Sequence, residues 1–316
     1  MVSINNDKPG HWKADVIASV DQFNRWFMQS APQAFRDSRV KATALVEAGV
    51  RQTGDLANIT PEILRANPNV LKILRMATCP PLARDRLAGL AGVNKTLIKA
   101  MEEKGTLPLR AKAAALDASL KQLADVFTQM LDYDLFPWLG RSDTANDDER
   151  HRASTIVADR LCGALSDPII RNAQEKRQLD LIGGHLVGKG YRQQAHPADR
   201  SITDMAPGTF TFRLNLTVAR GVKIPIDAVI QPKVPRVTKL PILIEAKSAG
   251  DFTNVNKRRK EEATKVHQLR GAYGEHVEFI LFLCGYFDTG YLGYEAAEGI
   301  DWVWEHRISD LDLLGI

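Results

Sequence analysis

The stretch Ile224–Lys247, IPIDAVIQPKVPRVTKLPILIEAK, decides the fold. Two short apolar runs flank a proline-broken link, and runs this rich in Ile, Val and Leu are typical of buried strands. Asp227 interrupts the first run, Glu245 interrupts the second, and Lys247 follows two positions later. An ionised carboxylate in a buried strand is costly unless something pairs with it. A hard divalent cation such as Mg²⁺, which prefers oxygen ligands, is one such partner.

The set Asp227, Glu245 and Lys247 resembles the PD-(D/E)XK nuclease signature, although one residue stands between Pro225 and Asp227. Three longer segments are similar to the XamI-type restriction endonuclease family: RMATCPPLARDRLAGLAGV (75–93), EAKSAGDFTNVNKRRKEE (245–262) and FLCGYFDTGYLGYEAAEGIDWVWEHR (282–307). The resemblance spans nearly the whole chain. It implies a type II restriction endonuclease that cleaves double-stranded DNA at a short palindromic site, GTCGAC, leaving 5′-phosphate and 3′-hydroxyl ends.

The same resemblance implies Mg²⁺ as cofactor, with Mn²⁺ as a substitute. A palindromic target implies a homodimer, because symmetric half-sites call for symmetric readers. The implied functional partner is a cognate DNA methyltransferase. Two alternatives stay open from the residues alone: a non-catalytic DNA-binding protein built on a nuclease-like core, and a repair nuclease without sequence specificity.

The acid set suggests a hydrolytic site. Asp227, Glu245 and the backbone carbonyl of Ala246 are the expected metal ligands, and the number of metals stays open. Lys247 projects from the same strand face as Glu245, so it is suited to orient or deprotonate a water, or to stabilise charge. The alternative is that both acids are strand-end residues paired with Lys247 or Arg213.

A further acid, Glu175, lies on a helix expected over 168–188 that precedes the first core strand. In the nucleases that this chain resembles, such a helix often offers another acid to the metal. The competing interpretation is a solvated glutamate next to Lys176.

The pattern of elements predicts an α/β fold over 151–316: a mixed central sheet flanked by helices, as in a PD-(D/E)XK core. Thr209–Val218 alternates, which predicts that its five apolar side chains share one face. The other elements expected are strands at 223–230, 240–247, 277–284 and 300–305 and a helix at 257–270.

Residues 1–150 are expected to form a mostly helical region, with the boundary in the polar segment 141–150. Two helices, 14–30 and 34–52, are predicted on either side of Pro32. Residues 82–104 predict a helix–turn–helix with Gly92 at the bend, an element that could lie in a DNA major groove. An ordinary helical hairpin is the alternative. The candidate DNA-binding residues here are Arg84, Arg86, Asn94, Lys95 and Lys99.

A second DNA-binding candidate lies directly after the acid site in the chain. A polar loop is expected over 248–256, with Asn254 facing the substrate, because loops after catalytic strands commonly do so. The basic cluster Lys257, Arg258, Arg259 and Lys260 is expected in the first turn of the next helix, where cations oppose the helix dipole unless a phosphate compensates. The alternative is a solvated cluster paired with Glu261 and Glu262.

Composition sets broad limits. The 316 residues carry a net charge of +4, which permits a nucleic-acid partner without demonstrating one. The three cysteines lack metal spacing and are expected to be reduced thiols in a cytoplasmic protein. Neither a secretory segment nor a membrane span is expected. The sequence has no GxSxG, HExxH, Walker or GxGxxG motif, and no histidine pattern for an HNH nuclease.

Overall fold

The computed structural model describes residues 3–108, 112–197, 200–234 and 236–316; within them, the side chains of 166–167, 220 and 253–259 are not described. The chain forms two compact units, Met1–Ser30 with Ile170–Ile316, and Ala31–Ile169. The helices α1 (Pro9–Gln52) and α7 (Asp147–Gly188) each contribute residues to both units. The units therefore divide within these two helices, whereas the sequence placed the division near residue 150.

Both long helices continue through a proline, at Pro32 and Pro168, where the sequence predicted a break. That prediction was wrong. A proline inside a helix costs about 3 kcal/mol because it removes a backbone hydrogen bond. Packing on either side outweighs this cost in α1, where Phe23 is buried before Pro32 and Val46 is buried after it.

The unit Ala31–Ile169 is helical, as predicted. Its core is a single apolar cluster that includes Leu74, Leu87 and Phe127, all fully buried. The elements that supply it, besides α1 and α7, are α2 (Pro61–Ala66), η1 (Pro68–Val70), α3 (Leu71–Met76), α4 (Arg84–Ala91), α5 (Lys95–Lys99), η2 (Ala100–Lys104), α6 (Ala113–Met130) and η3 (Pro137–Gly140).

The other unit is an α/β fold, which confirms the predicted class. Its sheet has the order β1-β2-β3-β4-β5-β6. Strands β2, β3 and β4 are antiparallel neighbours, while β4, β5 and β6 run parallel, and β1 runs parallel to β2. The strands are β1 (Arg192–Gln193), β2 (Thr209–Thr217), β3 (Lys223–Gln231), β4 (Ile242–Ala249), β5 (Glu278–Gly285) and β6 (Asp301–Trp304).

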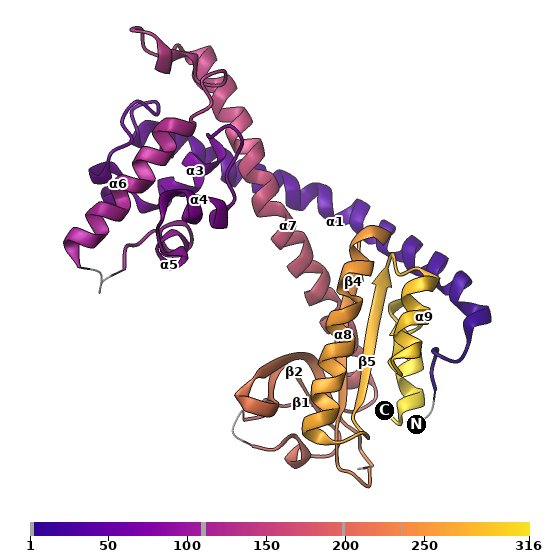
Figure 1. Ribbon diagram of the computed structural model, residues 1–316. Helices are drawn as coiled ribbons and strands as arrows, with labels where there is room; N and C mark the ends of the chain where they lie inside the picture. Colours follow the sequence, from indigo (N-terminus) through magenta and orange to yellow (C-terminus); the bar gives the residue numbers. More distant parts are fainter. Residues whose placement is uncertain (1–2, 109–111, 198–199, 235) are drawn as a thin grey trace. The chain divides into compact units, whose positions relative to one another are not determined.

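Helices cover both faces of this sheet. On one face, Val266 and Leu269 of α8 (Phe252–Tyr273) and Leu292 of α9 (Thr289–Ala297) share a cluster with alternate residues of β4 to β6. Figure 1 shows α8 and α9 running alongside β5. On the other face, Ile182 of α7 and Leu311 of η6 (Glu305–Leu314) pack on the intervening residues. Short 3₁₀ turns η4 (Ile202–Asp204) and η5 (Ala219–Gly221) flank β2.

The alternation of β2 does not hold along its length. Phe210 belongs to the cluster on the α7 face, whereas Leu214 and Leu216 belong to the cluster on the α8 face. The change occurs at Arg213, which has φ +54 and is skipped in the pairing of β2 with β3. A left-handed residue inside a strand turns the later side chains to the other face, so the prediction of five apolar side chains on one face was wrong.

The strand β4 and the helix α8 both extend beyond the predicted limits. β4 continues to Ala249 and α8 begins at Phe252, so the polar loop predicted over 248–256 is reduced to the short link between them. The basic residues 257–260 therefore lie beyond the first turn of α8, and the helix-dipole argument for a phosphate at that turn does not apply.

Two further features concern the length and apolarity of the helices and the state of the cysteines. Among the described residues, no helix combines the length and apolarity that a membrane crossing would need. The three cysteines are free thiols, with Cys162 and Cys284 buried and Cys79 exposed.

Candidate active site

Asp227 lies where the strand pairing opens. The pairing of β3 with β4 runs from Ile230 opposite Ile242 to Ala228 opposite Ile244 and stops before Asp227 and Glu245, which would be the next pair. On its other side, Asp227 is also skipped in the pairing with β2. Where the strand pairing stops, a side chain takes the place of a backbone acceptor: the Ala246 N–H donates a hydrogen bond to Asp227 Oδ2 at 2.8 Å. Asp227 is thereby fixed beside Glu245.

Glu245 is held by two ammonium groups. Its side chain is only 11% exposed; Oε2 pairs with Lys265 Nζ of α8 at 2.5 Å, and Oε1 pairs with Lys247 Nζ at 3.2 Å. The ion pair with Lys247 is the one that the alternative, structural interpretation of Glu245 expected, and it also places both side chains on one face of β4, as predicted. Lys265 is a second cation that the sequence pattern did not single out.

Lys247 bridges two carboxylates. Its Nζ lies 2.7 Å from Glu262 Oε1 of α8 as well as 3.2 Å from Glu245 Oε1. Burial alone would lower the pKa of Lys247, but the charges of the two glutamates outweigh it and raise the pKa above its ordinary value. Lys247 is therefore an ammonium at neutral pH, which favours charge stabilisation over proton abstraction.

Asp227 is the carboxyl group without an ammonium partner in this set. Burial raises its pKa to about 6, and the charge of Glu245 adds to the rise. The Ala246 N–H and the charge of Lys265 act in the opposite direction. The site thus holds a concentration of negative charge that its own cations do not fully offset, and a bound cation would relieve it.

The donor set can be compared with the needs of a divalent cation. Over the described part of the chain, no group of three or more His, Cys, Asp or Glu side chains is arranged to hold a metal. Mg²⁺ is usually held by one or two carboxylates and completes its shell with water and substrate phosphates. Asp227 and Glu245 fit such a site, in which DNA supplies the missing oxygens.

The side chain of Glu175 is engaged by an arginine rather than by the acid pair. It forms an ion pair with Arg213 at 2.9 Å and is 37% exposed, while its neighbour Lys176 pairs with Asp180. The charge of Glu175 nevertheless contributes to the raised pKa of Asp227, which places it in the surroundings of the site. Arg213, held at φ +54 opposite Asp227, is thus engaged by Glu175 rather than by either strand-end acid.

Glu262 and Lys265 are the residues that sequence reasoning missed. Glu262 was considered only as a solvated partner of the basic cluster, but it is 2% exposed and pairs with Lys247. A signal existed: Glu262 stands four positions before Val266 and seven before Leu269, the buried residues of α8, so it shares their face. A glutamate on the apolar face of a helix calls for a buried cation nearby.

The helical corner predicted over 82–104 is present. Gly92 ends α4 in the left-handed region, and the Asn94 side chain accepts a hydrogen bond from the Thr96 N–H at the start of α5. Three of the candidate cations are engaged in ion pairs: Arg84 with Glu102 and Glu103, Lys95 with Asp85, and Lys99 with Glu103. Arg86 is exposed.

The candidates of the second DNA-binding region are described only in part. Lys260 is exposed on α8 and lines a surface groove with Lys223 and Lys265. The side chains of Asn254, Lys257, Arg258 and Arg259 lie outside the described part of the structure.

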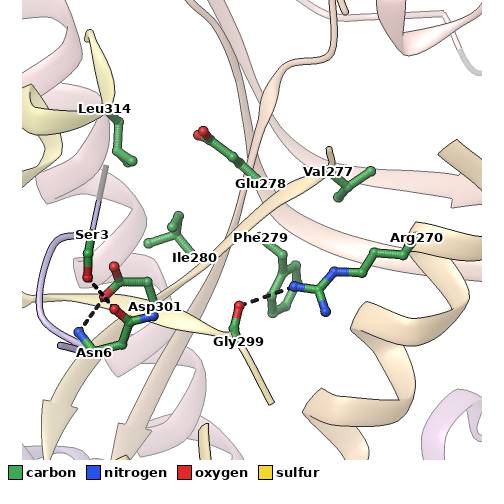
Figure 2. Close-up of a pocket in the computed structure, with 10 residues that line it drawn as sticks. All are labelled: Ser3, Asn6, Arg270, Val277, Glu278, Phe279, Ile280, Gly299, Asp301 and Leu314. Atoms are coloured by element: carbon green, nitrogen blue, oxygen red, sulfur yellow. Dashed lines mark hydrogen bonds between the residues drawn. The ribbon is translucent and has the colours of Figure 1, made fainter. Parts of the chain in front are cut away.

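A separate pocket lies at the opposite end of the parallel strands. Figure 2 shows Arg270, Glu278 and Asp301 among its lining residues. Glu278 is paired with Ile242, three positions before Glu245 in β4, so this pocket is not the acid site. Asp301 accepts hydrogen bonds from the N–H groups of Ile4 and Asn5, which gives it a structural role in anchoring the N-terminal segment.

Known proteins resemble this chain over nearly its whole length. A family model described as XamI restriction endonuclease matches residues 54–304, which include parts of both units. The type II restriction enzyme SalI of Streptomyces albus G is 55% identical over 314 residues, covering 99% of this chain and 99% of that enzyme.

Proposed function

The chain belongs to the XamI restriction endonuclease family and is a type II restriction endonuclease, and from this premise we propose that it hydrolyses double-stranded DNA at GTCGAC. The proposed reaction is of the PD-(D/E)XK type and depends on Mg²⁺, for which Mn²⁺ can substitute. The observation that carries the proposal is the placement of Asp227 and Glu245 side by side at the point where β3 and β4 separate, with Lys247 two positions further. The similarity to a type II restriction enzyme supports this function over a non-catalytic or unspecific DNA-binding protein.

The residues of the site have separate proposed roles in hydrolysis. Asp227, Glu245 and the Ala246 carbonyl would hold the metal, which when bound polarises the phosphate and lowers the pKa of water. The Lys247 ammonium stands beside Glu245, where it stabilises negative charge that develops on the phosphoryl oxygens. Glu262 holds Lys247 from the other side. Cleavage leaves the 5′-phosphate on one product and the 3′-hydroxyl on the other.

The DNA contacts are proposed for two regions. The basic residues 257–260 of α8, with Asn254, adjoin the acid site along the chain and are proposed to contact the DNA near the scissile bond. The corner formed by α4 and α5 is proposed as a recognition element, with Arg86, Asn94 and the paired cations. Its ion pairs must open before Arg84, Lys95 and Lys99 reach DNA.

The biological setting is inferred from the proposed target. A palindromic site is matched by a twofold homodimer, in which each protomer cuts one strand. The enzyme is proposed to act in the cytoplasm beside a cognate methyltransferase that protects the host DNA. Glu175 is proposed as an accessory acid, which would leave Arg213 before approaching a metal.

The test is digestion of a long defined DNA in Mg²⁺, with sequencing of the ends. Asp227→Asn and Glu245→Gln are expected to abolish cleavage while DNA binding persists. Glu275→Gln, which alters an exposed carboxylate just after α8, is the matched control and should cut like the unaltered protein. Cleavage by Asp227→Asn or Glu245→Gln near the unaltered rate would refute the site.

A further inference from the structure

The pairing of Lys265 with Glu245 has a consequence beyond holding the fold. Lys265 Nζ lies 2.5 Å from Glu245 Oε2, and its side chain is only 14% exposed. Its positive charge also acts on Asp227. In the free protein, therefore, an ammonium group occupies an oxygen of the acid pair that a metal would need.

Lys265 also lines a groove at the surface. Lys265 contributes to a groove of 520 Å³ between the start of β3 and α8, lined also by Lys223, Lys260, Thr264 and one carboxylate, Glu261. Three lysines along one groove suit a polyanion, and in this family that is a phosphodiester backbone. Among the described residues, Lys265 is the lysine of this groove that forms an ion pair with Glu245.

We propose that Lys265 is an internal counter-ion. In the free protein its ammonium group occupies the oxygen of Glu245 that a metal would bind, and when substrate binds it moves to a DNA phosphate in the adjoining groove. The proposal rests on the proposed function, since it assumes a metal at Asp227 and Glu245. Its consequence is that metal and DNA bind cooperatively. Without DNA, the metal must displace an ammonium group, whereas with DNA the phosphate has already withdrawn it. By linkage, each ligand then tightens the other by the same factor.

The geometry supports movement of Lys265 rather than of Lys247. Lys247 is held by two buried carboxylates, Glu245 and Glu262. Among the residues whose side chains are described, Lys265 makes one ion pair, and its Nζ lies 5.9 Å from the centre of the Phe279 ring. Withdrawal of Lys265 leaves Glu245 still paired with Lys247. Glu245 is thus never left without a cation, which makes the exchange feasible inside a buried site.

The variant that tests this is Lys265→Met, which removes the charge and retains an apolar stem against Phe279. Lys265→Gln is a second variant in case the first folds poorly. Lys260→Met is the matched control, since Lys260 lies in the same groove on the same helix but forms no contact with Glu245 among the described residues. The dissociation constant of Ca²⁺ is measured by calorimetry on the full chain at pH 8.5, with and without a DNA duplex that contains the target. The duplex is checked afterwards for cleavage.

The expected result is that Lys265→Met binds Ca²⁺ at least tenfold more tightly than the unaltered protein without DNA. Addition of DNA should tighten Ca²⁺ binding in all three proteins, because phosphate oxygens complete the cation's shell, but by a smaller factor in Lys265→Met than in the unaltered protein and in Lys260→Met. Both lysine variants should lower the salt dependence of DNA binding in EDTA by about one unit of slope.

Two failures are distinguishable. If the unaltered protein binds Ca²⁺ and Lys265→Met or Lys265→Gln binds it no more tightly, the counter-ion inference is overturned and the metal site stands. If no variant binds Ca²⁺ with or without DNA, the proposed metal site itself is refuted, and the inference falls with it.

Discussion

The replacement Asp227→Asn should make the metal-free protein more stable as well as inactive. The pKa of Asp227 rises from 3.8 to about 6 in the fold, first through burial and then through the charge of Glu245. Each pKa unit corresponds to ~1.4 kcal/mol, so ionisation of Asp227 costs the folded state about 3 kcal/mol at neutral pH. An asparagine carries no charge and still accepts a hydrogen bond from the Ala246 N–H.

The pH dependence is set by the sign of the shift. Below pH 3.8 the carboxyl is protonated in both states, so the variant has no advantage. Between pH 3.8 and about 6 the unfolded chain ionises while folded Asp227 stays protonated, so the unaltered protein loses stability as the pH rises. Above that window the advantage of Asp227→Asn is constant, at about 2–3 kcal/mol.

The assay is urea unfolding in EDTA at pH 4.5 and pH 8, followed by tryptophan fluorescence. Four of the five tryptophans, at positions 12, 26, 302 and 304, lie in the unit that carries the site. Glu261→Gln serves as the control for loss of an exposed carboxylate. If the advantage of Asp227→Asn were the same at both pH values, or were absent at pH 8, the argument from charge in a buried site would be refuted.

Three further predictions test other parts of the unit. Lys247→Ala should slow single-turnover cleavage by about 10²-fold and destabilise the protein, since Glu262 loses its ion pair; adding Glu262→Gln should restore stability in urea but not the rate. The buried Glu295 has a pKa raised to about 8, first by burial and then by the charge of Glu262, so the stability advantage of Glu295→Gln should grow between pH 4.5 and about 8 in the same unfolding assay. Gly285→Ala should cost about 2–4 kcal/mol in urea unfolding, because Gly285 has φ +104 and a Cβ would lie 2.1 Å from Ala249 O; Gly293→Ala, with only an ordinary contact to Trp12, should not.

The acids of the site could be found from sequence because they break a pattern. Asp227 and Glu245 interrupt strands that are otherwise apolar, and such interruptions are costly without a functional or structural reason. The spacing of Glu245 and Lys247 further fixed their shared strand face, which the ion pair between them now confirms.

The cations and the backbone around the site could not be found in this way. Lys265 acquires its role only from the packing of α8 on β4, which no local pattern reports. Arg213 adopts φ +54 inside an alternating strand, and alternation carries no signal for a reversal of faces. The start of α8 was misplaced because SAGDFTNVN is rich in residues that favour turns, and a local preference of this kind does not fix where a helix begins.

Charge at the site links these observations. Three carboxyl groups, Asp227, Glu245 and Glu262, face two ammonium groups, Lys247 and Lys265, and Asp227 is the one without an ammonium partner. Burial and then the charge of Glu245 raise the pKa of Asp227, and no ammonium pairs with it among the described residues to offset them. A divalent cation that takes the place of Lys265 brings two charges where one has left, which balances the three acids with Lys247 still in place. The same exchange frees the Lys265 ammonium, and a DNA phosphate in the adjoining groove gives it a new partner, so the metal that balances Asp227 and the DNA that receives Lys265 favour each other's binding.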